Sequence, residues 1–137
     1  MKLALACIAV IGCASATKPD PDMTWLTDET AAFTQARAEH KGVAIVFAAA
    51  WSVPDVELRR ELERAATTEL LAPAFVGLRV DCTDETPAIA ELRTRYHATT
   101  LPHLVFLRSD GLVLGRIDRL VTGDELRAQI RDAAAKR

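Results

Sequence analysis

Two periodicities of apolar residues alternate along the chain and mark its predicted elements. Residues 43–51 ("VAIVFAAAW") form a continuous apolar run of strand length, which is typical of a central strand buried on both faces. From Ser52 to Ala66 the apolar residues, Leu58 and Leu62 among them, recur at helical spacing with arginines between them. The change of period predicts a buried strand that leads directly into an amphipathic helix.

The remaining elements follow from the same patterns and from turn and capping residues. A capping box from Thr122 to Glu125 opens the last helix, and Pro87 suits the first turn of the helix before it. Strands that alternate with helices form parallel crossovers, and a terminal hairpin adds an antiparallel edge. We therefore expect a three-layer α/β/α sandwich with a mixed central sheet. The other expected helices are 27–40, 84–98 and 124–137, and the other expected strands are 75–82, two within 102–117 joined by a turn at 109–111, and a short one near Trp25.

Residues 1–16 ("MKLALACIAVIGCASA") are typical of an export leader. Lys2 precedes an apolar stretch that is too short to span a bilayer. The residues before Cys13 resemble a lipobox, so we favour cleavage before Cys13 and lipidation of this cysteine; cleavage after Ala16 by an ordinary signal peptidase is the alternative. Residues 17–24 are then a tether, and residues 25–137 are the folded domain.

The cysteines bear on location and on crosslinking. If the leader is removed and Cys13 is lipidated, Cys82 is the one thiol left, and no intramolecular disulfide can form. Ala14, which is not an acid, argues against retention in the inner membrane. We expect a protein on the periplasmic side of a bacterial cell envelope, lipid-anchored to the outer membrane. Cleavage after Ala16 would instead give a secreted or free periplasmic protein.

Charge and histidine placement disfavour two classes of partner. The net charge is -2, and the arginines are interleaved with acids, so the clustered basic face of a nucleic-acid-binding protein is missing. His40, His97 and His103 fall on different predicted elements and share no ligand spacing with Cys82. We expect neither a metal site nor a cofactor.

Four stretches of the sequence resemble the thioredoxin-like superfamily, and most closely the C-terminal thioredoxin domain of DsbD-type thiol:disulfide interchange proteins. They are "HKGVAIVFAAAWSVPDVEL", "FVGLRVDCTD", "YHATTLPHLVFLRSDG" and "GRIDRLVTGDELRAQI". The resemblance covers roughly residues 25–133. It implies a thioredoxin fold, an active-site turn after Trp51, and a cis-proline at Pro102 beside that turn.

The residues that exchange disulfides in this family are missing. Ser52 stands at the position of the attacking cysteine and Asp55 at that of the resolving cysteine, and neither side chain can form a disulfide. Val46 stands where related redox domains carry a buried acid, and an apolar residue there fits a domain that no longer moves protons. The resemblance thus implies a degenerate, redox-silent site with no catalytic residue.

Ser52 and Asp55 also match a helix-capping pattern. We expect the Ser52 hydroxyl to cap free amides of the helix while Asp55 reaches back toward the helix start, and Pro54 suits the first turn. A hydrolytic Ser52 with His103 as its base is the alternative, but the cap explains the same residues without catalysis.

The expected function is binding of an extended peptide or protein partner in the groove inherited from the family's active site. Two alternatives remain open: a thiol:disulfide oxidoreductase-related activity through Cys82, and a structural or assembly role. If the protein is an enzyme, it is oxidoreductase-like. Cys82 follows Asp81, an acid that should raise the thiol pKa, so a structural thiol is favoured. The expected groove residues are Trp51, Ser52, Val53, Pro54, Asp55, Leu101 and Pro102.

Overall fold

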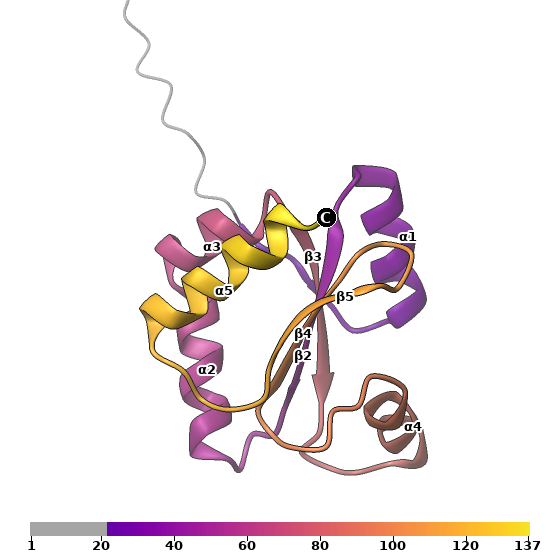
Figure 1. Ribbon diagram of the computed structural model, residues 1–137. Helices are drawn as coiled ribbons and strands as arrows, with labels where there is room; N and C mark the ends of the chain where they lie inside the picture. Colours follow the sequence, from indigo (N-terminus) through magenta and orange to yellow (C-terminus); the bar gives the residue numbers. More distant parts are fainter. Residues whose placement is uncertain (1–21) are drawn as a thin grey trace, which may run out of the picture.

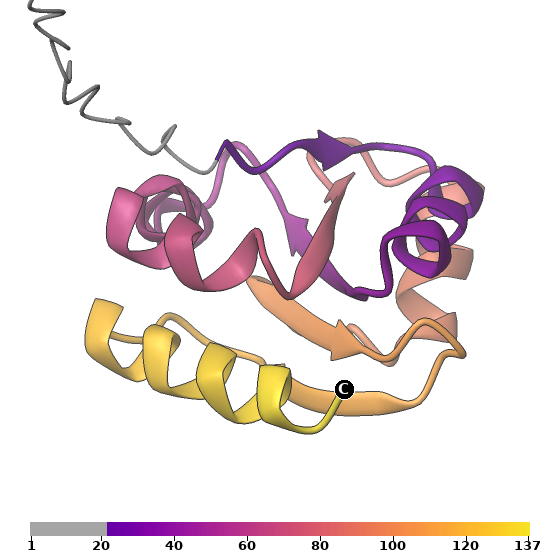
Figure 2. The same cartoon turned by 90° about the horizontal axis from the view of Figure 1, so that it is seen from above.

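The computed structural model describes residues 22–137, in which a five-stranded sheet lies between two layers of helices (Figures 1 and 2). The predicted leader, with Cys13, lies outside the described residues. No helix within residues 22–137 is both long and apolar enough to cross a membrane. In chain order the elements are β1 (Trp25–Leu26), α1 (Glu29–Glu39), β2 (Gly42–Ala48), α2 (Val53–Glu63), α3 (Ala65–Leu71), β3 (Phe75–Asp81), α4 (Pro87–Arg95), β4 (His103–Leu107), β5 (Val113–Ile117) and α5 (Gly123–Ala135).

The strands are arranged in the order β1-β3-β2-β4-β5. β2 pairs in parallel with β3 and antiparallel with β4, and β5 pairs antiparallel with β4. The predicted mixed sheet is therefore confirmed, with the terminal hairpin at one edge and β1, parallel to β3, at the other. This is a thioredoxin fold.

The central strand β2 separates two apolar cores, because successive side chains of a strand point to opposite faces. Val46 packs with Leu58 and Leu62 on the face covered by α2, α3 and α5, whereas Ile45 and Phe47 pack on the face covered by α1 and α4 (Figure 2). All of these side chains are buried. This burial on both faces is the reason why the strand needs a continuous run of apolar residues, as the sequence predicted.

The single helix expected from Ser52 to Ala66 is wrong, because the chain breaks into α2 and α3 at Arg64. The backbone of Arg64 is extended, with φ -68° and ψ 139°. The hydroxyl of Thr68 donates toward the carbonyl oxygens of Leu62 at 3.3 Å and Arg64 at 3.1 Å. The first of these bonds serves a carbonyl at the end of α2, whereas the Arg64 carbonyl also accepts the Thr68 N–H at 2.9 Å in the first turn of α3.

Two helix starts depend on threonine caps. The Thr122 hydroxyl accepts from the Glu125 N–H at 3.2 Å, as the capping box predicted. The Thr86 hydroxyl accepts from the Ile89 N–H at 3.3 Å, so α4 begins at Pro87, three residues after the expected boundary.

Candidate functional site

The candidate site lies at the carboxyl end of β2, where the chain turns into α2. The antiparallel register of β2 and β4 pairs Phe47 with His103. The start of β4 therefore lies beside the end of β2, just before the turn. The Leu101–Pro102 peptide bond is cis. The turn and the segment before β4 therefore form one end of the sheet.

Asp55 is the anchor of this turn, and it is buried, with 1% of its surface exposed. Its Oδ2 accepts from the Ala49 N–H at 2.6 Å, and its Oδ1 accepts from the Ser52 hydroxyl at 2.8 Å. Both carboxylate oxygens therefore have donors, which is the condition under which a buried carboxylate is tolerated. The two bonds join the end of β2 to the first turn of α2.

The cap predicted for Ser52 is wrong in its details. Ser52 occupies the N-cap position, but its side chain makes no hydrogen bond to a helix amide. The hydroxyl donates to the carboxylate of Asp55 instead. A hydrogen bond to a charged acceptor is stronger than one between neutral groups. Asp55 reaches back past Ser52 and accepts the N–H of Ala49. The carboxylate alone therefore bonds to the backbone at the helix start, a role that the pattern assigned to both residues.

A cavity of about 100 Å³ lies behind the turn, between α2 and the ends of β2 and β3. Val46, paired in register with Arg79, lines this cavity, and so does Asp55. The sequence indicated that the family's buried acid had been lost at Val46. The structure shows a buried carboxylate lining the cavity beside Val46, supplied by α2 instead of β2.

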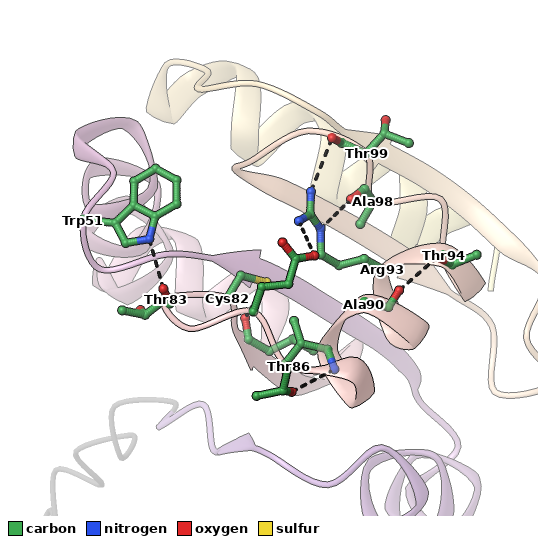
Figure 3. A network of polar contacts seen from close by, with 12 residues as sticks. Trp51, Cys82, Thr83, Thr86, Ala90, Arg93, Thr94, Ala98 and Thr99 are labelled. Carbon is green, nitrogen blue, oxygen red and sulfur yellow. Dashed lines mark hydrogen bonds and ion pairs between the residues drawn. The ribbon is translucent and has the colours of Figure 1, made fainter.

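Trp51 is an exposed aromatic residue with a fixed orientation. Its side chain is 69% exposed, yet its indole N–H donates to the carbonyl oxygen of Thr83 at 3.2 Å (Figure 3). The Thr83 hydroxyl accepts from the Ala50 N–H at 2.9 Å, and the Thr83 N–H donates to Asp81 at 2.9 Å. The donors on Thr83 lower the pKa of Asp81. Sequence reasoning missed Thr83, although an aspartate two residues before it is typical of a side-chain turn.

The other expected groove residues divide between surface and interior. Val53 is 72% exposed, whereas Asp55 and Pro102 are buried and support the surface from beneath. Leu101 is half-buried, and within residues 22–137 neither its N–H nor its C=O makes a backbone hydrogen bond. Trp51, Val53 and Leu101 are called the binding face below. The face combines exposed apolar side chains with free backbone groups.

His103 does not join Ser52. Its ring is buried and packs edge-on against Phe47, with ring centroids 6.4 Å apart. Its Nε2 lies 3.1 Å from a guanidinium nitrogen of Arg116, and its Nδ1 has no partner among the described residues. Burial and the neighbouring charge of Arg116 lower the pKa of His103. Since the Ser52 hydroxyl is bonded to Asp55, the structure does not assemble the serine–histidine pair of the hydrolytic alternative.

Cys82, the free cysteine among residues 22–137, is a buried thiol, with 5% of its surface exposed. Its sulfur lies 3.7 Å from the carbonyl oxygen of Val80. Burial is the largest cause of its raised pKa, and the charge of Asp81 raises it further. A thiol of this kind is a poor nucleophile. Residues 22–137 contain no group of three or more His, Cys, Asp or Glu side chains that could hold a metal ion.

Comparisons with known proteins agree with this geometry. Residues 24–109 match the protein family described as thioredoxin-like. The chain belongs to the thioredoxin-like family. No curated protein matches the sequence.

Similar solved structures include several disulfide-exchange proteins of the same fold. A thioredoxin from Thermus thermophilus is 23% identical, with 83% of this chain and 88% of that chain covered and a TM-score of 0.72. The C-terminal domain of Neisseria meningitidis DsbD in its oxidised form is 20% identical, with 80% and 99% covered and a TM-score of 0.69. A DsbH oxidoreductase is 18% identical, with 85% and 87% covered and a TM-score of 0.68.

The two bonds of Asp55 should contribute unequally to stability. Asp55→Ala leaves the Ala49 N–H without its acceptor, which should lower the free energy of unfolding by about 1–3 kcal/mol. Ser52→Ala removes only the hydroxyl donor and should cost about 1 kcal/mol or less. Urea unfolding of the two variants measures the difference. A larger loss in Ser52→Ala would contradict the central role of Asp55.

His103 should make the protein less stable in acid. Because its folded-state pKa lies below the ordinary value of 6.5, the unfolded chain takes up the proton first as the pH falls. His103 therefore has no effect above that value, and the free energy of unfolding falls as the pH drops from there toward the folded-state pKa. The slope of this loss cannot exceed about 1.4 kcal/mol per pH unit for one proton. Urea unfolding at about pH 8 and about pH 5.5 measures this effect. Between the two pH values, the free energy of unfolding should fall less in His103→Phe than in the unmodified protein. Equal losses in the two proteins would contradict this assignment.

Proposed function

We propose that this thioredoxin-like protein binds an extended segment of a peptide or protein partner at the binding face and does not exchange disulfides. The observation that supports this best is the free backbone N–H and C=O of Leu101 at the end of the sheet that also carries the exposed, oriented indole of Trp51. An extended chain can add itself as a strand to such free groups, and its side chains then find apolar contacts.

The side chains of the binding face favour an apolar partner segment. Trp51 and Val53 are among the most exposed large apolar residues of the described chain, and exposed apolar side chains that lie together commonly mark interaction sites. The indole N–H is already bonded to Thr83. Trp51 therefore offers its ring faces rather than a donor, and we expect aliphatic or aromatic partner residues to pack on it.

Three features support redox silence. The two positions that carry cysteines in the family hold Ser52 and Asp55, and these residues are hydrogen-bonded to each other. The remaining thiol among residues 22–137, Cys82, is buried and has a raised pKa. Exchange needs an accessible thiolate and a second thiol to resolve the mixed disulfide. The oxidoreductase-related alternative through Cys82 therefore has no support in this geometry.

The proposed setting is the periplasmic side of a bacterial cell envelope, with lipid at Cys13 as the anchor. Its basis is the leader sequence. The similar structures that carry the names DsbD and DsbH are compatible with this setting.

Reduction of insulin by dithiothreitol tests redox silence. The full chain should not accelerate the reaction above the uncatalysed rate, because no thiolate is presented at the helix start. The double variant Ser52→Cys/Asp55→Cys is the matched control and should gain turnover if the fold still supports exchange. Turnover by the unmodified chain that disappears in Cys82→Ser would overturn the proposal.

Capture of partners from envelope extract tests binding. Immobilised full-length protein should retain a partner that Trp51→Ala loses, with at least about a tenfold drop in the amount bound, as expected for an aromatic contact residue. Leu112→Ala is the matched control, because Leu112 is also exposed, at 52%, but lies in the turn between β4 and β5. An identical set of captured proteins for Trp51→Ala and the unmodified chain would contradict the proposal and favour a structural role.

A further inference from the structure

Residues 96–100, between α4 and β4, form no strand or helix of their own, and arginine side chains add to the turn hydrogen bonds of their backbone. The Arg93 Nε donates to the Ala98 carbonyl oxygen at 3.0 Å, and its Nη2 donates to the Thr99 carbonyl oxygen at 3.4 Å (Figure 3). Arg116 donates to the carbonyl oxygen of Tyr96. Side-chain donors thus add to the backbone hydrogen bonds that set the path of the chain to Leu101.

Arg93 also connects this segment to the loop that orients Trp51. Its Nη1 donates to Glu85 at 3.1 Å, and Glu85 lies two residues after Thr83, the acceptor of the indole N–H. The backbone C=O of Arg93 accepts from the Ala98 N–H at 2.8 Å, so Arg93 forms hydrogen bonds with both the N–H and the C=O of Ala98. A single residue of α4 therefore contacts both the segment that leads to Leu101 and the loop in which Thr83 holds the indole of Trp51.

We infer that Arg93 is the positioning residue of the binding face. It fixes the backbone of Leu101 relative to the ring of Trp51. One extended chain can then pair with the Leu101 backbone while its side chains pack on the Trp51 ring. The inference rests on the proposed function and adds the element that pre-organises the face. Binding to a pre-ordered face avoids the entropy cost of ordering two loops at the moment of association.

The arrangement depends on the shape of the guanidinium group. Arg93 serves two carbonyl oxygens and one carboxylate from one planar group, and its side chain is only 21% exposed. A lysine has one ammonium on a flexible stem and cannot hold three acceptors in this fixed pattern. Hydrogen bonds with a charged donor are also stronger than neutral ones, which suits a clamp on otherwise irregular backbone.

A thiol probe at Ser52 measures the geometry of the face directly. The parent is the full chain with Ser52→Cys, Cys7→Ser, Cys13→Ser and Cys82→Ala. The probe is a blocked hexapeptide of apolar residues around a central cysteine activated as its 2-thiopyridyl disulfide. The thiolate attacks the peptide sulfur, a protein–peptide disulfide forms, and pyridine-2-thiolate leaves and is read by its absorbance. The same disulfide on N-acetylcysteinamide gives the rate without peptide pairing.

The ratio of the two rates is the readout, because any effect on the reactivity of the thiol cancels in it. Arg93→Met in the parent should lower the ratio about tenfold, because the peptide must then order the loop as it binds. Arg93→Lys should lower the ratio of the two rates almost as much. Arg95→Met is the matched control on the same helix, since Arg95 pairs with Glu29 and Glu91 instead of the loop, and should leave the ratio unchanged.

Hydrogen exchange separates the two proposals. Arg93→Met should raise the exchange rates of the Ala98 and Thr99 amides at least about tenfold, since these are hydrogen-bonded within the clamped segment. If the parent reacts with the hexapeptide no faster than with the N-acetylcysteinamide disulfide, the proposed function is refuted, even where the amide exchange rates support the role of Arg93. A clear preference that survives Arg93→Met, or unchanged exchange rates in that variant, would overturn the positioning role.

Discussion

The hydrogen bond from the Ala49 N–H to the buried carboxylate of Asp55 is the constraint on which the site depends. It ends the central strand, sets the direction of α2, and draws the Ser52 hydroxyl inward. The strand itself is held by packing on both faces, so the turn after it has a rigid base. Without an acceptor at this position the Ala49 N–H would be buried and unpaired, which a folded chain seldom tolerates.

The same constraint explains how a disulfide-exchange fold persists without its thiols. The strand–turn–helix geometry depends on backbone packing and on one polar connection across the turn. Asp55 supplies that connection, and Trp51 keeps its orientation through Thr83, whose contacts involve no sulfur. The surface that we propose for partner binding is thus separable from the chemistry of the family's thiols.

Sequence patterns predicted the parts of the molecule that depend on local periodicity. The doubly buried β2, the short edge strand at Trp25 and the cap at Thr122 were all foreseeable, because each is encoded within a few neighbouring residues. The inward turn of Asp55 was not, since a Ser-x-x-Asp pattern is compatible with both a surface cap and a buried anchor. The helix break at Arg64 and the clamp by Arg93 were also missed. Both involve side-chain bonds to carbonyl oxygens outside the regular helical pattern.

The anchoring role of Asp55 also constrains the evolutionary routes open to the protein. Replacing Asp55 by cysteine alone would remove the acceptor of Ala49 before any exchange partner existed at Ser52. Replacing Ser52 by cysteine alone would set a thiol against a carboxylate, whose charge opposes formation of the thiolate. Either single step costs stability or gives a thiol whose ionisation the neighbouring carboxylate opposes, so disulfide exchange at this turn is favoured most when both residues change together.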